Sequence, residues 1–385
     1  MTIDERLSGP SDSEREWLRV RSHLIRHRFT LAVTAADDYP PDVRVAGTPL
    51  LADQRWLPPV PLPLDSIDLH LDVTGGARGL TGREQLSEPV RPLRANGTRY
   101  GTYSAAVAEL AAPAVFNNLP TYRLLAADLS GGRGRMLFGR GRYFDALDVG
   151  EACAHEYAAH TLGLGGTPLR AAVAQPWDLT ARSTNMAIST LTLRVDRTAG
   201  AASFLLHWRD PATVGHAGGL YQVIPVGVFQ PSGTAPGNER NDFDLWRSSI
   251  REFSEELLGN PENYGSDLLP IDYDAWPFAA RLNRARDRGQ LRLFVLGMGT
   301  DPLTFATDLL TVAVFDAPMF DEVFGNLVTA NNEGRVLSTL AAGSSGPGIA
   351  FSEQNVARIV RREPTQAAGA ALLALAWRHR DVLMA

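Results

Sequence analysis

Residues 244–262 (DLWRSSIREFSEELLGNPE) are the segment that most constrains how this chain can fold. Large apolar side chains recur there at intervals of three and four residues: Trp246, Ile250, Phe253 and Leu257. This spacing places them on one face of a helix, and such a face must be buried against another layer of structure. Gly259 follows, at the position where a left-handed glycine commonly ends a helix. The segment therefore predicts a buried helix over 244–258.

The same helix carries three carboxylates on a neighbouring face. Glu252, Glu255 and Glu256 are spaced i, i+3 and i+4. Like charges at this spacing destabilise an isolated helix by roughly 0.2–0.5 kcal/mol per pair, and a divalent cation would remove that repulsion. Carboxylate oxygens suit Mg²⁺ or Mn²⁺. Arg251 lies one turn before Glu255 and can pair with it, and the alternative interpretation is an ordinary amphipathic helix with an acidic solvent face.

Residues 251–259 (REFSEELLG) resemble the core of the Nudix box, Arg-Glu-apolar-x-Glu-Glu-x-Gly-apolar. Upstream, the stretch 224–227 (IPVG) at the end of a predicted strand resembles the Leu-Pro-Gly-Gly stretch where that box begins. In this family the strand–loop–helix unit holds a divalent metal against a diphosphate. The resemblance covers about residues 184–340. It implies that Glu255 and Glu256 are the main metal ligands, that Glu252 is a further ligand or the base, and that Arg251 orients the glutamates.

The spacing departs from the family pattern in two places. The separation of Gly227 from Arg251 is about ten residues longer, and the family's isolated glutamate, which follows the first glycine of the box, falls on Gly233. Glu239 in the enlarged loop is one candidate replacement, and a register that begins at Gly237 instead puts Phe243 at that position. The end of the box also holds one extra residue, Glu-Glu-Leu-Leu-Gly in place of Glu-Glu-x-Gly.

The rest of the chain predicts two regions. Residues 1–180 are expected to form an N-terminal α+β region, with a helix from Ser11 or Ser13 to about Arg28, a strand at 29–34 and a proline-rich extended segment at 38–64. Residues 181–385 alternate strands and helices around one mixed sheet and end in a helical extension. We expect an α+β or α/β protein whose C-terminal half is a Nudix-like α/β/α sandwich. Further strands are predicted at 66–73, 122–129, 135–143, 186–195, 202–208, 221–230 with a break at Pro225, 291–297 and 309–315.

Composition excludes several classes of function. Lysine is absent and all 37 basic residues are arginine, which excludes Schiff-base chemistry and an orthodox P-loop nucleotidase. Cys153 is the one cysteine, so an intrachain disulfide and a multi-cysteine zinc site are excluded. A net charge of −6 argues against a general nucleic-acid coat or a polybasic membrane surface. The acidic start and the lack of a long apolar run lead us to expect a cytoplasmic protein without a membrane span.

A glycine-rich segment at 131–142 supplies four more cations, Arg133, Arg135, Arg140 and Arg142. Guanidinium and backbone N–H groups there could cradle a phosphate, whereas the simpler interpretation is a solvated hairpin, which we favour. The order of the two regions resembles actinobacterial proteins that join a helix-turn-helix region to a Nudix-like domain. No convincing helix-turn-helix pattern occurs in residues 1–180, so we expect no nucleic-acid partner.

The resemblance implies Mg²⁺- or Mn²⁺-dependent hydrolysis of a nucleoside diphosphate linked to another group, with a nucleotide-like small molecule as the partner. Two alternatives stay open. The divergent box could belong to a regulatory module that binds a nucleotide or other small ligand without cleaving it, or to a biosynthetic enzyme that reuses the scaffold, because one fold hosts many functions. A homodimer also stays open.

Overall fold

The computed structural model describes residues 9–74, 79–209, 219–261, 264–325, 330–331, 334–337 and 348–385. Its largest sheet has seven strands and is mixed: β11 runs parallel to β5, and the other pairings are antiparallel. The expected α+β or α/β class with a mixed sheet is confirmed. The strands follow the order β1 (Leu62–Pro63), β10 (Leu291–Thr300), β11 (Thr307–Asp316), β5 (Met186–Asp196), β6 (Ala201–Phe204) and β14 (Ile349–Ala350), with β9 (Val226–Val228) also paired to β5.

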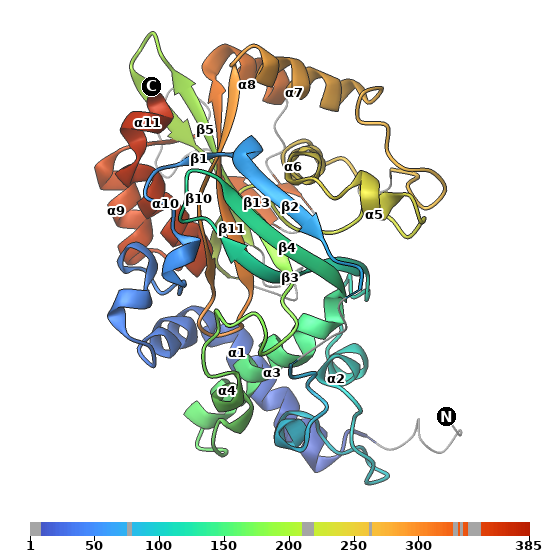
Figure 1. Ribbon diagram of the computed structural model, residues 1–385. Coiled ribbons are helices and arrows are strands. Elements are labelled where there is room, and N and C mark those ends of the chain that lie inside the picture. Colours follow the sequence, from blue (N-terminus) through green and yellow to red (C-terminus); the bar gives the residue numbers. More distant parts are fainter. Residues whose placement is uncertain are drawn as a thin grey trace.

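Helices cover both faces of this sheet. Figure 1 shows α6 and α7 on one side and α9 and α10 on the other. Each helix buries an apolar face against the strands; Phe253 and Phe315, for example, meet edge to face with ring centroids 5.6 Å apart. The C-terminal half contains α5 (Asn238–Asn241), α6 (Leu245–Glu252), α7 (Pro277–Asp287), α8 (Ala317–Phe324), α9 (Glu353–Arg362), α10 (Ala367–Arg378) and α11 (Arg380–Met384).

Two smaller sheets flank the large one. A three-stranded sheet has the order β2 (Ile67–Leu71), β4 (Gly134–Arg142) and β3 (Pro120–Asp128). A four-stranded sheet has the order β12 (Ala330–Asn331), β13 (Gly334–Leu337), β7 (Leu206–Arg209) and β8 (Tyr221–Val223). The predicted 221–230 strand is thus split between β8 and β9 around Pro225, which has no N–H to donate to a ladder.

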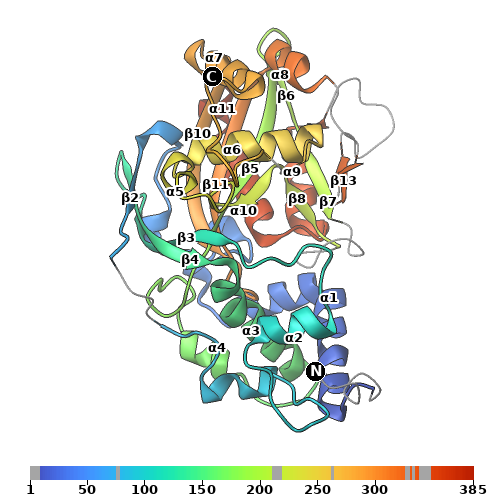
Figure 2. The same ribbon diagram turned by 90° about the vertical axis from the view of Figure 1, so that its right-hand side faces the viewer.

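The N-terminal helices gather at one end of the molecule (Figure 2). They are α1 (Asp12–Ala36), α2 (Tyr103–Leu110), α3 (Tyr143–Thr161) and α4 (Pro168–Val173). Ser11 caps α1 as predicted, and its capping box is completed by Glu14. The helix does not stop near Arg28: the predicted strand at 29–34 is wrong, because Leu31 and Ala35 continue the buried face of α1. A buried carboxylate on α3, Glu151, pairs with Arg21 at 2.6 Å and Arg28 at 2.9 Å and so joins α1 to α3.

The proline-rich segment ties the N-terminal region to the large sheet. Leu62 and Pro63 pair with Val295 and Phe294 at its edge, and the Leu51 N–H donates to the Thr300 carbonyl at 3.0 Å. One continuous hydrophobic core contains residues from both regions, including Trp56, Phe138, Phe229 and Phe315. The division into residues 1–180 and 181–385 stays a prediction, although packing is continuous across that boundary. No helix in the described part of the chain is long and apolar enough to cross a membrane.

A buried carboxyl group in the large sheet makes stability depend on pH. Asp308 on β11 is 2% exposed and accepts a hydrogen bond from the Ser189 hydroxyl on β5 at 2.8 Å. Burial is the main cause that raises the pKa of Asp308 from 3.8 to about 7, and the charge of Asp301 acts in the same direction. The folded state therefore keeps a proton that the unfolded chain releases at lower pH.

We predict that the free energy of unfolding falls between about pH 4 and pH 7 through this group and that Asp308→Asn removes the fall. The unfolded chain ionises Asp308 first, so raising the pH in this window favours unfolding, by up to about 1.4 kcal/mol per pH unit. Urea unfolding of both proteins at several pH values measures the difference. The exposed Asp42→Asn change is the control and should keep the wild-type slope. Identical slopes for wild type and Asp308→Asn would contradict the prediction.

Candidate functional site

The predicted glutamate helix lies against the short strand β9. All four residues of its predicted apolar face, Trp246, Ile250, Phe253 and Leu257, are buried. Gly227, at the centre of β9, faces Glu252 so closely that a Cβ atom added to the glycine would lie 1.9 Å from the Glu252 carboxyl carbon. Only glycine can occupy this position while the carboxylate keeps its place. The resemblance between 224–227 and the start of the box therefore corresponds to a close approach of strand and helix.

Glu256 also faces β9. It is 8% exposed, and its Oε1 atom accepts the Val226 N–H at 3.0 Å. Two of the three predicted ligands, Glu252 and Glu256, are thus held at neighbouring residues of one strand. The hydrogen bond from this backbone N–H fixes the direction of the Glu256 side chain.

The carboxylates stand on an irregular turn. α6 ends at Glu252, and Phe253–Leu257 form a π-helical turn that contains Glu255 and Glu256. Because a π-turn holds one residue more than an α-turn, it accounts for the extra residue between Glu256 and Gly259. Gly259 has φ +69° and ends the helix in the left-handed conformation, as predicted.

Glu255 receives a hydrogen bond from a residue that the sequence did not single out. The Tyr264 hydroxyl donates to Glu255 Oε1 at 2.6 Å and lies 3.4 Å from the Arg251 carbonyl. Burial, followed by the charge of Glu255, holds the pKa of Tyr264 far above its usual value, so the phenol stays a neutral donor. The ring of Tyr264 rests edge-on against Trp276, with centroids 5.3 Å apart.

Arg251 has a different partner from the one predicted. Its guanidinium is 4% exposed and donates to the Tyr273 hydroxyl at 2.6 Å and the Gln230 carbonyl at 2.7 Å. Its ion-pair partner among the described residues is Asp242, at 3.4 Å, and not Glu255. The predicted pairing with Glu255 is therefore wrong, and Arg251 fixes the helix to the loop that precedes it.

Asp242 is the acidic residue of the enlarged loop that meets this arginine. It is fully buried and accepts hydrogen bonds from the Ser232 N–H at 2.7 Å, the Ser232 hydroxyl at 2.6 Å and the Tyr273 hydroxyl at 2.8 Å. The register beginning at Gly237 placed the family's isolated acid on Phe243, one residue away. This register, which points to the neighbouring residue, was the one sequence signal for Asp242. No sequence pattern indicated Tyr273 or Tyr264.

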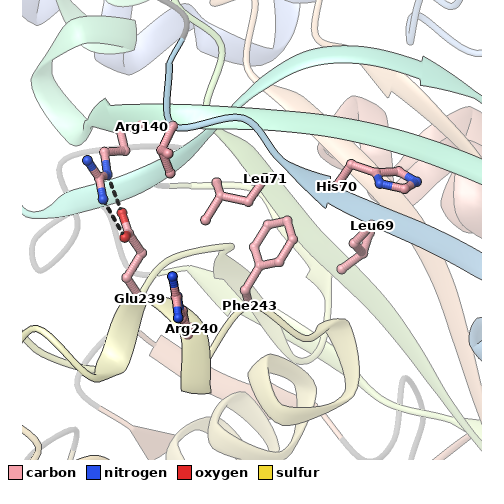
Figure 3. A pocket seen from close by; sticks show the side chains of 8 residues that line it. Leu69, His70, Leu71, Arg140, Glu239, Arg240 and Phe243 are labelled. Atoms are coloured by element: carbon pink, nitrogen blue, oxygen red, sulfur yellow. Dashed lines mark hydrogen bonds and ion pairs between the residues drawn. The ribbon is translucent and has the colours of Figure 1, made fainter.

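Glu239, the proposed replacement in the loop, lies elsewhere. It forms a two-pronged ion pair with Arg140 of β4, at 2.6 Å to Nε and 2.8 Å to Nη2 (Figure 3). Arg140 belongs to the glycine-rich segment 131–142. Arg133 of this segment pairs with Asp68 at 3.0 Å. The segment forms the β3–β4 hairpin, which agrees with the simpler of its two interpretations.

The donor set suits a hard cation in its chemistry. Glu252, Glu255 and Glu256 supply carboxylate oxygens, which are the ligands that such a cation prefers. Within the described ranges, no group of three or more His, Cys, Asp or Glu side chains is placed to hold a metal ion. If a cation binds, the three glutamates are the residues that would hold it, together with water and substrate oxygens.

A scan against protein-family models finds no match, and no curated protein matches the chain.

We predict that Asp242→Asn destabilises the protein by about 3 kcal/mol, because it removes the ion-pair partner of the buried Arg251 guanidinium. Urea unfolding at neutral pH measures the loss. The matched control is Glu239→Gln, which breaks an ion pair whose side chains are 63% and 29% exposed and should cost clearly less stability. Equal losses in the two variants would show that the Asp242–Arg251 pair has no special role.

Proposed function

We propose that this protein hydrolyses a nucleoside diphosphate linked to another group, in a reaction that depends on Mg²⁺ or Mn²⁺. The observation that carries the proposal is the approach of Glu252 to Gly227, with Glu256 fixed to the adjacent Val226 N–H. Together with the resemblance of 251–259 to the Nudix box, this arrangement supports a site where carboxylates and strand backbone face one diphosphate. The mixed sheet with helices on both faces (Figure 1) also supports the proposal.

In the proposed reaction a water oxygen attacks one phosphorus atom and the bridging P–O bond breaks. A bound divalent cation supplies charge neutralisation for the phosphate oxygens and a lower pKa for water. Glu252, Glu255 and Glu256 would hold it, and one of them would accept the proton that the water loses. Arg251 acts at a distance: its bonds to Asp242, Tyr273 and Gln230 fix the turn from which the carboxylates project.

A second candidate is a module that binds a nucleotide without cleaving it. Two contacts favour it: Tyr264 donates to Glu255 Oε1, and Val226 donates to Glu256 Oε1. Each bond uses one of the lone pairs with which the carboxylate would bind a cation, so it would weaken metal binding and with it the hydrolytic step. Both candidate functions require nucleotide binding, and only the hydrolase would also turn over its substrate.

We expect metal-dependent release of phosphate or nucleotide from at least one member of a panel of nucleoside diphosphate derivatives. Glu255→Gln and Glu256→Gln should each lower the rate by about 100-fold or more, because each removes a charge from the cation site. Asp42→Asn, which removes an exposed acid outside both the glutamate helix and its loop, serves as the matched control and should retain the wild-type rate.

The outcomes separate the candidates. Turnover that needs Mg²⁺ or Mn²⁺ and disappears in Glu255→Gln supports hydrolysis. Nucleotide binding in a calorimeter without turnover supports the binding module. Absence of both would refute the two candidates and leave the glutamate helix as a structural element.

A further inference from the structure

A hollow of about 420 Å³ lies between the edge strand β2 and the short helix α5, apart from the glutamates (Figure 3). Its lining comes from three segments that are distant in sequence. They are β2 with the residues after it, β4, and α5 with Phe243. The lining residues are Leu69, His70, Leu71, Val73, Arg140, Glu239, Arg240 and Phe243. Its volume falls within the range typical of small-molecule sites, about 300–1,000 Å³.

Two opposite walls of the hollow carry apolar side chains, and these do not fill the space between them. Leu69 and Leu71 project from the same face of β2, because side chains alternate along a strand, and both are only half-buried. Phe243 lies opposite them (Figure 3). Its ring is fixed from behind by Tyr122 and Phe138, with centroids 5.0 Å and 5.6 Å away. The phenylalanine therefore cannot move across to fill the space, and apolar surface stays accessible on both walls.

The polar side carries a net positive charge. Arg140 is neutralised by its ion pair with Glu239, the one acidic residue in the lining. Arg240 follows Glu239 in α5 and is exposed, and within the described ranges no carboxylate forms an ion pair with it. The hydrogen bond from Arg140, and to a lesser degree the charge of Arg240, lowers the pKa of Glu239, so one carboxylate stands between two guanidinium groups. An anion beside Arg240 would balance the charge.

We propose that this hollow is a binding site for a small organic anion with a flat apolar part. The anionic group pairs with Arg240, and the apolar part lies between Leu71 and Phe243. Guanidinium recognises phosphate, sulfonate and carboxylate alike, so these charged groups share one mode of binding. None of the lining residues belongs to the glutamate site, and the proposal holds whether or not the protein is a hydrolase.

Two fluorescent dyes test the proposal. 1-Anilinonaphthalene-8-sulfonate combines flat apolar rings with a sulfonate, and N-phenyl-1-naphthylamine has the same rings without the charge. Both should bind the wild-type protein saturably. Arg240→Gln should weaken binding of the sulfonate dye about five- to tenfold, the loss expected for one charge-assisted contact, and leave the neutral dye unchanged.

Three further variants locate the site. Glu239→Gln releases Arg140 from its ion pair and should tighten binding of the sulfonate dye severalfold. Leu71→Asn places a polar group on the apolar wall and should weaken both dyes; Leu71→Ala replaces it if the first variant does not fold. Arg19→Gln removes an exposed arginine from α1, outside the hollow, and is the matched control that should bind like wild type. Thermal unfolding of each variant confirms that it is folded.

Three results would overturn the proposal. Binding of the sulfonate dye that is unaffected by both Arg240→Gln and Leu71→Asn would place the dye elsewhere and overturn the proposal. The same conclusion follows if neither dye binds saturably, or if Arg240→Gln weakens the neutral dye as much as the charged one.

Discussion

The buried guanidinium of Arg251 is the group on which the arrangement of the candidate site depends. Its three partners come from before and after the helix: Gln230 and Asp242 from the loop that follows β9, and Tyr273 from the segment that leads to α7. A buried cation keeps its place only while its counter-charge and hydrogen-bond acceptors stay in place. The helix, the enlarged loop and the segment before α7 therefore form one unit, and β9 is placed against the carboxylates as a consequence.

The enlarged loop has two different sides. Asp242 points inward to Arg251, whereas Glu239 and Arg240, three and two residues earlier, face the three-stranded sheet of the N-terminal region. Phe243 follows at once and packs with Tyr122, Phe138 and Phe229 from both regions. The loop between β9 and α6 thus contacts the N-terminal sheet on one side and anchors the glutamate helix on the other. A ligand between β2 and α5 would touch residues adjacent to that anchor.

Local patterns were sufficient for much of the fold. The helix at 244–258, the long strands β5, β10 and β11 and the glycine at 259 follow from spacing and turn chemistry, which depend on neighbouring residues. The error at 29–34 has a tertiary cause: Leu31 and Ala35 extend the face of α1 that packs on α3, and burial there outweighs local preference for a strand. Asp242 and Tyr273 escaped prediction because their meeting, 31 residues apart, is decided by packing.

Both departures from the family spacing have a structural counterpart in this chain. The extra residue before Gly259 is taken up by the π-turn, and the longer loop places an acid, Asp242, against Arg251. A sequence pattern records separations along the chain, whereas chemistry depends on separations in space. An inserted loop that leaves the site and returns to it lengthens the separation along the chain but can keep the same separation in space. Divergent spacing is therefore weaker evidence against a diphosphate site here than the replacement of a glutamate or of Gly227 would be.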